Sequence, residues 1–417
     1  MKDGFKIHKM RKLLQIDSCL GVGSTGRITE SIAKLAQGLG WECYIVHGGR
    51  YVKRPSCMTD IQTVSKLGEY LHYAESLLFD NHGLASRSAT KRVVEEIKKI
   101  KPDVIQLHCV HGYYLNYKIL FEYLQTTNIP IVWTFHDCWA FTGHCAYFDS
   151  IGCEKWQVGC NNCALKTSYP TSKLLDRSKQ NYDLKKKLFT AVERQLVIVP
   201  VSYWLEGLVK KSFFHKTRVH TIHNGINIGV FRPRETESLR AKLGIGEKKV
   251  ILCVAMPWTQ RKGLPDLLQL STMLPQDEYQ IILVGLNDKQ LQNLPINVTG
   301  LKRTNSVDEL AELYSLASVF VNPTYEDNFP TTNIEALACG TPVVTYKTGG
   351  SPEAVDEKTG RVVEKGDVEG IKVAVYDIVQ KKDLKRKDCR ERAASLYDAN
   401  IAFASYINLY ESILCDQ

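Results

Sequence analysis

Short, uninterrupted apolar runs recur along the chain and alternate with stretches of helical periodicity. Each run is apolar at successive positions, as in strands that are buried on both faces of a parallel sheet. The clearest runs lie at 11–17, 42–47, 103–107, 131–137, 249–254, 279–286, 319–324 and 342–346. Amphipathic stretches such as 89–101 and 306–317 separate them. This alternation predicts an α/β fold with parallel sheets, which bind ligands at the carboxyl ends of their strands.

Length and composition fit a globular protein with more than one core. The chain has 417 residues, of which 44% are hydrophobic and 24% are charged, and this length predicts two or three domains. No apolar run is long enough to span a membrane, and the start lacks the apolar region of a signal peptide. The 13 cysteines then indicate a reducing compartment, with thiols or a metal site in place of disulfides.

The stretch at 322–353, NPTYEDNFPTTNIEALACGTPVVTYKTGGSPE, combines a strand end, a short helix, a second strand and a glycine-rich turn. Pro330 precedes the helix, Thr331 or Thr332 is placed to cap it, and Gly340 ends it. Asp327 then lies on a loop aimed at the helix N-terminus. The N–H groups there favour an anion or a sugar oxygen, and carboxylates accept hydrogen bonds from hydroxyls. These features favour a polyhydroxyl ligand with a diphosphate over an ordinary surface loop.

This stretch resembles the E-x7-E region of the retaining glycosyltransferases of family 4. The resemblance implies the GT-B fold, in which two Rossmann-like domains with parallel sheets face each other across a cleft. It also implies that Glu335 holds the ribose of a nucleotide. Asp327 stands where the first Glu is usual, and Glu326 would need a one-residue insertion to serve instead. One of these two acids would meet the donor sugar, together with the neighbouring residues Asn328, Phe329, Pro330 and Thr331.

Two cations near a second helix start extend this resemblance. Arg261 and Lys262 precede Gly263, and cations beside N–H groups at a helix start suit a diphosphate leaving group. The family usually has an Arg a few residues earlier, where 255–259 holds no cation, so we assign that role to Arg261. No D-x-D motif occurs in the sequence. We therefore expect activity without a divalent metal and no cofactor for catalysis.

A glycine-rich loop follows the first predicted strand. Gly21, Gly23 and Gly26 form a G-x-G-x-x-G pattern, which is typical of phosphate binding but weak alone. A dinucleotide enzyme would place an acid at the end of the second strand, whereas this chain has 47–50 as His-Gly-Gly-Arg. NAD is disfavoured, and NADP bound by Arg50 stays open. The resemblance implies instead that the loop residues Gly23, Ser24, Thr25 and Gly26 touch the donor phosphate or the acceptor.

His136 ends another predicted strand, where the resemblance implies that it faces the donor sugar and the reaction centre. It would contribute hydrogen bonds there and not act as a general base, since retaining enzymes of this type are thought to use the leaving phosphate as proton acceptor. The alternative is a hydrogen-bonded structural histidine. Residues 51–90 are expected to be irregular.

Four cysteines lie close together in an insert at 138–170. Cys145, Cys153, Cys160 and Cys163 end in a C-x2-C pair, a spacing that is competent for structural zinc. Free or disulfide-forming thiols are the alternative. A loop-rich segment with little core would gain stability from a metal.

Charge divides unevenly along the chain. Residues 1–220 carry 31 Lys and Arg against 19 Asp and Glu, a net charge of +12, and the remainder carry 23 against 26, a net charge of −3. The basic half favours an anionic partner such as a membrane-linked lipid phosphate, or is simply a solvated basic surface. We expect no nucleic-acid partner, because no recognised binding motif accompanies the charge.

These observations predict three parts: an acceptor-side domain at 1–222, a nucleotide-sugar domain at 223–398 and a helix at 399–417 that packs back on the first domain. The insert is similar to that of bacterial transferases that build exopolysaccharide, colanic acid or capsule. We therefore expect transfer of a hexose-type sugar from a UDP or GDP donor to a lipid-linked glycan, with retention, in the cytoplasm or at the inner membrane face. The alternatives are an NADP-dependent oxidoreductase and a non-catalytic partner subunit.

Overall fold

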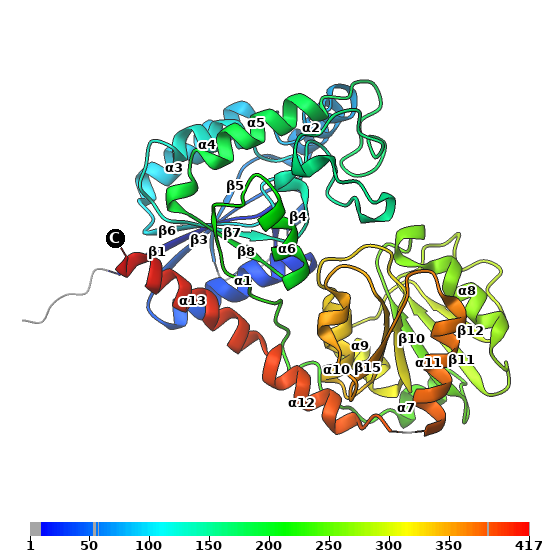
Figure 1. The fold of residues 1–417 in the computed structure, drawn as a ribbon. Coiled ribbons are helices and arrows are strands. Elements are labelled where there is room, and N and C mark those ends of the chain that lie inside the picture. The colour runs from blue at the N-terminus through cyan, green and yellow to red at the C-terminus, as the bar shows by residue number, and fades with distance from the viewer. Residues whose placement is uncertain (1–9, 53–55, 57, 382, 417) are drawn as a thin grey trace, which may run out of the picture. The chain divides into compact units, whose positions relative to one another are not determined.

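The computed structural model describes residues 10–52, 56, 58–381 and 383–416. The chain forms two compact units (Figure 1). Unit 1 runs to Val201 and includes Leu205–Ile222 and the residues from Phe403 onward, whereas unit 2 comprises Ser202–Trp204 and His223–Ala402. Residues 1–9, on which the expectation of no signal peptide partly depends, lie outside the described residues.

Unit 1 is built on a parallel sheet of seven strands in the order β5-β3-β1-β6-β7-β8-β9. Figure 1 shows α3, α4 and α5 along one face of this sheet and α1 and α13 along the other. The elements are β1 (Lys12–Ile16), β2 (Cys19–Leu20), α1 (Gly23–Gly38), β3 (Glu42–His47), β4 (Tyr51–Val52), β5 (Thr59–Gln62), α2 (Lys66–Phe79), α3 (Arg87–Ile100), β6 (Val104–Leu107), α4 (Tyr117–Leu124), β7 (Ile131–Phe135), α5 (Ser178–Thr190), β8 (Leu196–Pro200), α6 (Tyr203–Lys211), β9 (Arg218–Val219) and the end of α13 (Ala399–Cys415).

Unit 2 has a parallel sheet of six strands in the order β12-β11-β10-β13-β14-β15. In Figure 1, α9 and α10 lie on one side of it and α8 and α11 on the other. The elements are α7 (Glu237–Lys242), β10 (Lys249–Val254), α8 (Leu264–Met273), β11 (Tyr279–Val284), β12 (Val298–Leu301), α9 (Val307–Leu316), β13 (Val319–Asn322), α10 (Thr331–Ala338), β14 (Val343–Tyr346), β15 (Gly360–Val363), α11 (Val368–Lys381) and α12 (Arg386–Leu396).

Helix layers on both faces explain the continuous apolar runs in the sequence. β7, β8, β11, β13 and β14 are buried at every position, because neither face of such a strand meets water. The last helix completes unit 1, where the hydroxyl of Tyr410 donates to the side-chain oxygen of Gln106 on β6 and its ring packs against Trp41. The expected α/β fold with parallel sheets is confirmed.

The expectation of an irregular segment at 51–90 is wrong. This segment holds β5, the whole of α2 and the start of α3. α2 buries the polar residues Glu69, His72 and Ser76 and exposes leucines. Its pattern is the reverse of an ordinary surface helix, so the segment shows no inward apolar face in the sequence. Among the described residues, no helix is long and apolar enough to cross a membrane.

Candidate active site

Each sheet reverses its strand order at one point, and ligands of doubly wound sheets bind at the carboxyl ends of the strands there. In unit 2 this switch point lies between β10 and β13. The loop after β10 carries Arg261 and Lys262, and the loop after β13 carries Glu326 and Asp327. The topology of unit 2 therefore brings together the cations and acids that the sequence singled out.

Two side-chain contacts join these loops. The Lys262 Nζ lies 2.5 Å from the Asp327 Oδ2, and both side chains keep nearly a fifth of their surface exposed. The Arg261 Nη1 donates to the backbone oxygen of Glu326 at 2.7 Å. Asp327 thus presents its carboxylate to the cation pair, whereas Glu326 contributes its backbone and keeps its side chain buried.

Two glycines permit this close approach. Gly263 has φ +74°, and a Cβ there would lie 2.1 Å from the backbone oxygen of Pro323. Gly349, in the turn after β14, has φ +53°, and its Cβ would lie 1.8 Å from the backbone oxygen of Asp327. Both positions combine left-handed backbone with contact distances that no side chain fits. The glycines therefore hold the cation loop and the glycine-rich turn against the acidic loop.

α10 starts at Thr331 and points its first turn into this loop. The expectation that Thr331 or Thr332 caps the helix is wrong, because Pro330 occupies the N-cap and no side chain caps the first turn. Proline locks the backbone before the helix but offers no side-chain oxygen. The N-terminal N–H groups, with the positive end of the helix dipole, are the part of this site suited to an anion.

Glu335 lies on α10 and is only 6% exposed. Its Oε2 accepts a hydrogen bond of 2.9 Å from the hydroxyl of Tyr314, a fully buried residue of α9. Tyr314 was missed in the sequence, where a tyrosine inside a helical repeat is read as core. It fixes one carboxylate oxygen of Glu335.

Two further predicted donor residues of unit 2, Asn328 and Phe329, are buried in the same loop. Asn328 and Phe329 are 2% and 3% exposed. The ring of Phe329 packs between His223 and Tyr397, and its backbone oxygen accepts from the side chain of Asn224. The Phe329 ring therefore anchors the loop.

In unit 1 the strand order reverses between β1 and β6. The glycine-rich loop follows β1, and Gly23, Ser24, Thr25 and Gly26 form the first turn of α1. Gly23 and Ser24 are exposed, whereas Gly26 is buried. A Cβ at Gly26 would lie 3.0 Å from the Cβ of Cys19. Gly26 thus serves close packing, and the exposed N-terminus of α1 is the part able to meet a ligand.

Asp17, directly after β1, is a buried acid that the sequence analysis missed. Its Oδ2 accepts from the hydroxyl of Thr29 at 2.9 Å, and its Oδ1 accepts from the N–H of Ser18 at 2.7 Å. Burial raises the pKa of Asp17 to about 6, although these hydrogen bonds oppose the shift. His136 was identified because a polar residue directly follows a buried strand. Asp17 follows β1 in the same way, so the sequence could have revealed it.

His136 follows β7 and stacks on His108, with 5.4 Å between ring centroids. The His136 Nε2 and the His108 Nδ1 are 3.1 Å apart, and the His108 Nε2 lies 3.2 Å from the Oε1 of Gln15. Since glutamine oxygen only accepts, the His108 Nε2 carries the proton and its Nδ1 accepts from His136. Desolvation lowers the pKa of His136 to about 4. A neutral imidazole at this sheet edge suits hydrogen bonding.

A histidine–carboxylate pair, His111 and Asp137, lies at the same edge of the sheet. The His111 Nε2 is 3.0 Å from the Asp137 Oδ2, and the other oxygen of Asp137 accepts from the N–H of Trp139. Burial raises the pKa of Asp137, but His111 and the hydrogen bonds outweigh it and hold the pKa below its ordinary value.

Arg50, the residue available for NADP, lies over the rings of Tyr51 and Tyr70.

The cysteine-rich insert is a compact loop region between β7 and α5. Cys145, Cys153, Cys160 and Cys163 all line one cavity of about 320 Å³. The Cys160 Sγ accepts from the backbone N–H of Gly143 at 3.2 Å. A hydrogen bond from the Cys145 thiol lowers the pKa of Cys163 to about 6 and raises that of Cys145. The buried Nζ of Lys185 on α5 holds the start of the insert through the backbone oxygens of Trp139 and Thr142.

His144 lines the same cavity. Its Nδ1 lies 2.6 Å from the Asp80 Oδ1, at the end of α2, and its buried Nε2 has no hydrogen-bond partner. A metal-binding histidine usually donates one ring N–H to a carboxylate and binds the metal through its other nitrogen. His144 has this arrangement, with Asp80 at Nδ1 and no hydrogen-bond partner at Nε2. In the described ranges, however, no group of three His, Cys, Asp or Glu side chains is arranged to hold a metal ion.

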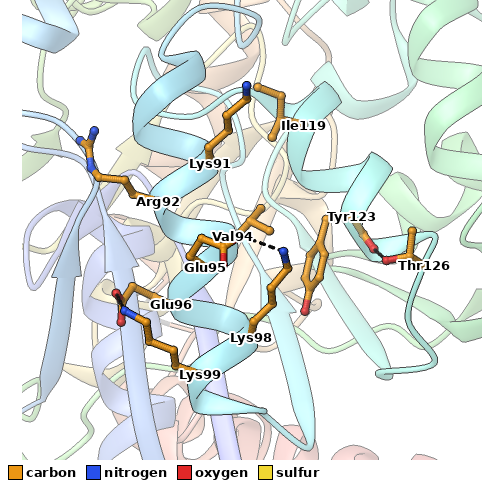
Figure 2. A pocket seen from close by; sticks show the side chains of 10 residues that line it. All are labelled: Lys91, Arg92, Val94, Glu95, Glu96, Lys98, Lys99, Ile119, Tyr123 and Thr126. Atoms are coloured by element: carbon orange, nitrogen blue, oxygen red, sulfur yellow. Dashed lines mark hydrogen bonds and ion pairs between the residues drawn. The ribbon is translucent and has the colours of Figure 1, made fainter.

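A larger groove of about 750 Å³ lies between α3 and α4, away from both switch points. Figure 2 shows the Lys98 ammonium paired with Glu95 and lying beside the ring of Tyr123. Its lining charges alternate in sign along α3, which is typical of a solvated helix face. We assign no ligand to this groove.

Two family models match the chain in succession. The first, Glycosyltransferase Family 4, matches residues 25–230, and the second, Glycosyl transferases group 1, matches residues 235–396. Together they span both compact units. The chain belongs to the family 4 glycosyltransferases. The resemblance seen at 322–353 is confirmed, and the oxidoreductase alternative is set aside.

Relatives of this glycosyltransferase agree with that assignment. It is 26% identical to WcaC of Escherichia coli (strain K12), whose name assigns it to glycosyl transfer in colanic acid biosynthesis, over 75% of this chain and 77% of WcaC. Its structure is similar to sucrose-phosphate synthase of Thermosynechococcus elongatus, with a TM-score of 0.72 and 18% identity over 98% and 100% of the two chains. It is also similar to Alr3699/HepE of Anabaena in complex with UDP-glucose, with a TM-score of 0.66 and 15% identity over 96% and 99%. These two likenesses establish the GT-B fold alone.

Proposed function

We propose that this glycosyltransferase moves a hexose-type sugar from a UDP or GDP donor to a growing, lipid-linked surface polysaccharide and retains the anomeric configuration. The observation that carries the proposal is the Lys262–Asp327 contact at the switch point of unit 2, beside the uncapped first turn of α10. Cations and N–H groups for a diphosphate thus lie next to a carboxylate for sugar hydroxyls.

In the proposed donor complex, Arg261 and Lys262 bind the diphosphate together with the α10 N-terminus. Glu335, oriented by Tyr314, accepts from the ribose hydroxyls. Asp327 accepts from hydroxyls of the transferred sugar, with the backbone of 328–331 alongside. The fold neighbour Alr3699/HepE, solved with UDP-glucose, supports a nucleotide sugar as the donor class.

The proposed reaction takes place on one face of the donor sugar. The bond between the anomeric carbon and the diphosphate oxygen breaks, and a bond from that carbon to the acceptor hydroxyl oxygen forms on the same face. The hydroxyl proton passes to the departing diphosphate oxygen, so that the nucleoside diphosphate leaves. Arg261 and Lys262 stabilise the negative charge that develops on it, without a divalent metal. His136 contributes a hydrogen bond at the reaction centre.

The acceptor class rests on two observations. WcaC, to which most of the chain is similar, is named for colanic acid biosynthesis. The first 220 residues carry a net charge of +12, which suits an acceptor linked to a lipid phosphate at the cytoplasmic face of a membrane.

We further propose a structural zinc ion in the cysteine-rich insert. All four predicted ligands, Cys145, Cys153, Cys160 and Cys163, line one cavity. His144 lines the same cavity and its buried Nε2 has no hydrogen-bond partner, so it is an alternative to Cys153 as the fourth ligand.

Donor turnover tests the proposed function. Purified protein, EDTA and a set of UDP and GDP sugars are incubated with a lipid-linked glycan acceptor. We expect one donor to be consumed in EDTA, and NMR of the product to show the donor's anomeric configuration. Glu335→Ala and Lys262→Ala should abolish turnover with the fold intact. Turnover that survives both changes, or an inverted product, would contradict the proposal.

A further inference from the structure

α2 carries its apolar side chains on the outside. Leu67 and Leu71 are 67% and 64% exposed, and Tyr70 and Leu78 are also exposed. Leu67, Leu71, Ala74 and Leu78 follow one another three or four positions apart, and Tyr70 lies beside Leu71, so they form a single stripe along the helix. We call this stripe the α2 apolar face.

The inward side of α2 is polar and fully used. The Glu69 Oε1 accepts from the N–H groups of Gly49 and Arg50. The His72 Nδ1 contacts the hydroxyl of Ser86, and its Nε2 accepts from the N–H of Gly83. α2 is thus anchored through its polar side, while the α2 apolar face stays exposed.

Neighbouring segments extend the apolar surface. The backbone N–H groups of Lys173 and Leu175 donate to the oxygens of Leu77 and Leu78, which places the exposed Leu174 and Leu175 beside the end of α2. The Arg50 guanidinium lies over the rings of both Tyr51 and Tyr70, which places Tyr51 near α2. α2 and these two segments hold nine of the 22 exposed large hydrophobic side chains in the described part of the chain. A concentration of this size marks an interaction surface.

The charges around the surface favour an anionic partner. Lys66 begins α2, Arg50 lies over the ring of Tyr70, and Lys173 lies beside the end of the helix; all three are exposed. Apolar side chains with tyrosines and flanking cations are the composition of helices that lie in the interface of an anionic bilayer. A second copy of this basic unit would instead bring like charges together.

We propose that the α2 apolar face docks this enzyme on an anionic lipid bilayer, with Leu67, Leu71 and Leu78 in the acyl boundary and Lys66, Arg50 and Lys173 at the headgroups. The inference rests on the proposed function in one respect: a lipid-linked acceptor would require the enzyme to work at a membrane surface. The surface itself lies outside the proposed donor site.

Vesicle flotation tests the proposal with the full chain. The wild type should float with vesicles of phosphatidylethanolamine and phosphatidylglycerol, far less with phosphatidylcholine alone, and less as salt rises. Leu67→Gln/Leu71→Gln should weaken this partition by about tenfold or more. The control Leu39→Gln/Ile296→Gln changes two comparably exposed side chains elsewhere and should float like the wild type.

Three outcomes would overturn the proposal: wild type that does not float, the double variant floating unchanged, or a wild-type dimer in light scattering that the double variant converts to monomer. The last would assign the α2 apolar face to a second copy of the chain. Stabilisation by UDP or GDP is measured on the same samples. If it persists in the variant, failure of docking is separated from failure of the proposed function.

Discussion

The ammonium of Lys262 and the carboxylate of Asp327 are 2.5 Å apart at the switch point of unit 2, although 65 residues separate them in sequence. The neighbouring acid, Glu326, meets the same loop through its backbone oxygen, which accepts from Arg261. The two adjacent acids therefore have different positions, and this difference predicts which of them serves the donor sugar.

Asp327→Asn should lower kcat/KM for the donor sugar by about tenfold to a hundredfold, since a hydrogen bond to a charged group contributes about 1.5–3 kcal/mol. Glu326→Gln keeps the backbone contact and should change kcat/KM less than about threefold. Steady-state kinetics of both variants, with melting temperatures as the folding control, decide the point. A larger loss in Glu326→Gln would reassign the sugar contact to Glu326.

Tyr314→Phe tests the orientation of Glu335. The change removes the 2.9 Å hydrogen bond to Glu335 and keeps the buried ring. We expect the donor KM to rise several-fold with little change in kcat, because a ribose contact is made equally in the ground state and the transition state. Tyr279→Phe, at a buried tyrosine of β11, is the matched control. A fall in kcat at constant KM would place Glu335 in the chemical step instead.

The sequence predicted the local structure at 322–340 because its signals are local. A buried strand, a proline before a helix and a glycine after it fix where 322–340 turns, and the structure has both ends of α10 within two residues of that prediction. The partners Lys262 and Asp327 were each identified, but their pairing depends on strand order. Only the adjacency of β10 and β13 brings the two loops together.

Zinc content tests the proposal for the cysteine-rich insert. Protein purified without chelators should contain about one zinc per chain. A strong chelator should lower the melting temperature, because a loop-rich segment loses its cross-link. Cys163→Ser should lose the metal, whereas Cys415→Ser, at an exposed cysteine of α13, should retain it. Loss of zinc in either Cys153→Ser or His144→Gln identifies the fourth ligand.

Absence of stoichiometric zinc together with chelator-independent melting would contradict the zinc proposal. So would mass spectrometry that finds a disulfide between Cys145 and Cys163, the two sulfurs that already share a hydrogen bond.

His72 should make unit 1 sensitive to acid. Desolvation by burial lowers the pKa of His72 from 6.5 to about 4. Between these two pKa values the unfolded chain binds a proton that the folded chain does not, so stability falls as pH falls. From about pH 7 to about pH 5 this contribution amounts to a loss of about 2 kcal/mol.

Denaturant unfolding at both pH values measures this effect. His72→Gln should lose about 2 kcal/mol less stability on acidification than the wild type. His215→Gln, at an exposed histidine, should behave like the wild type. An equal loss in His72→Gln would show that other groups cause the acid sensitivity.

What the sequence did not reveal has a common physical cause. The apolar stripe of α2 was missed because periodicity is read on the assumption that apolar residues face inward, whereas here Glu69 and His72 do. The Asp80–His144 pair joins residues 64 positions apart, and neither position predicts the other. Both features depend on tertiary packing that no local pattern encodes.

A thermal-shift screen without metal tests the central claim most directly. The ligands are UDP, GDP, their sugars and NADP, and the proteins are the wild type and Lys262→Ala. A ligand that binds only the folded chain must raise its melting temperature. We predict stabilisation of the wild type by one nucleoside diphosphate and a much smaller shift in Lys262→Ala. Stabilisation by NADP alone, or by no diphosphate, would contradict a nucleotide-sugar site at Lys262 and Asp327.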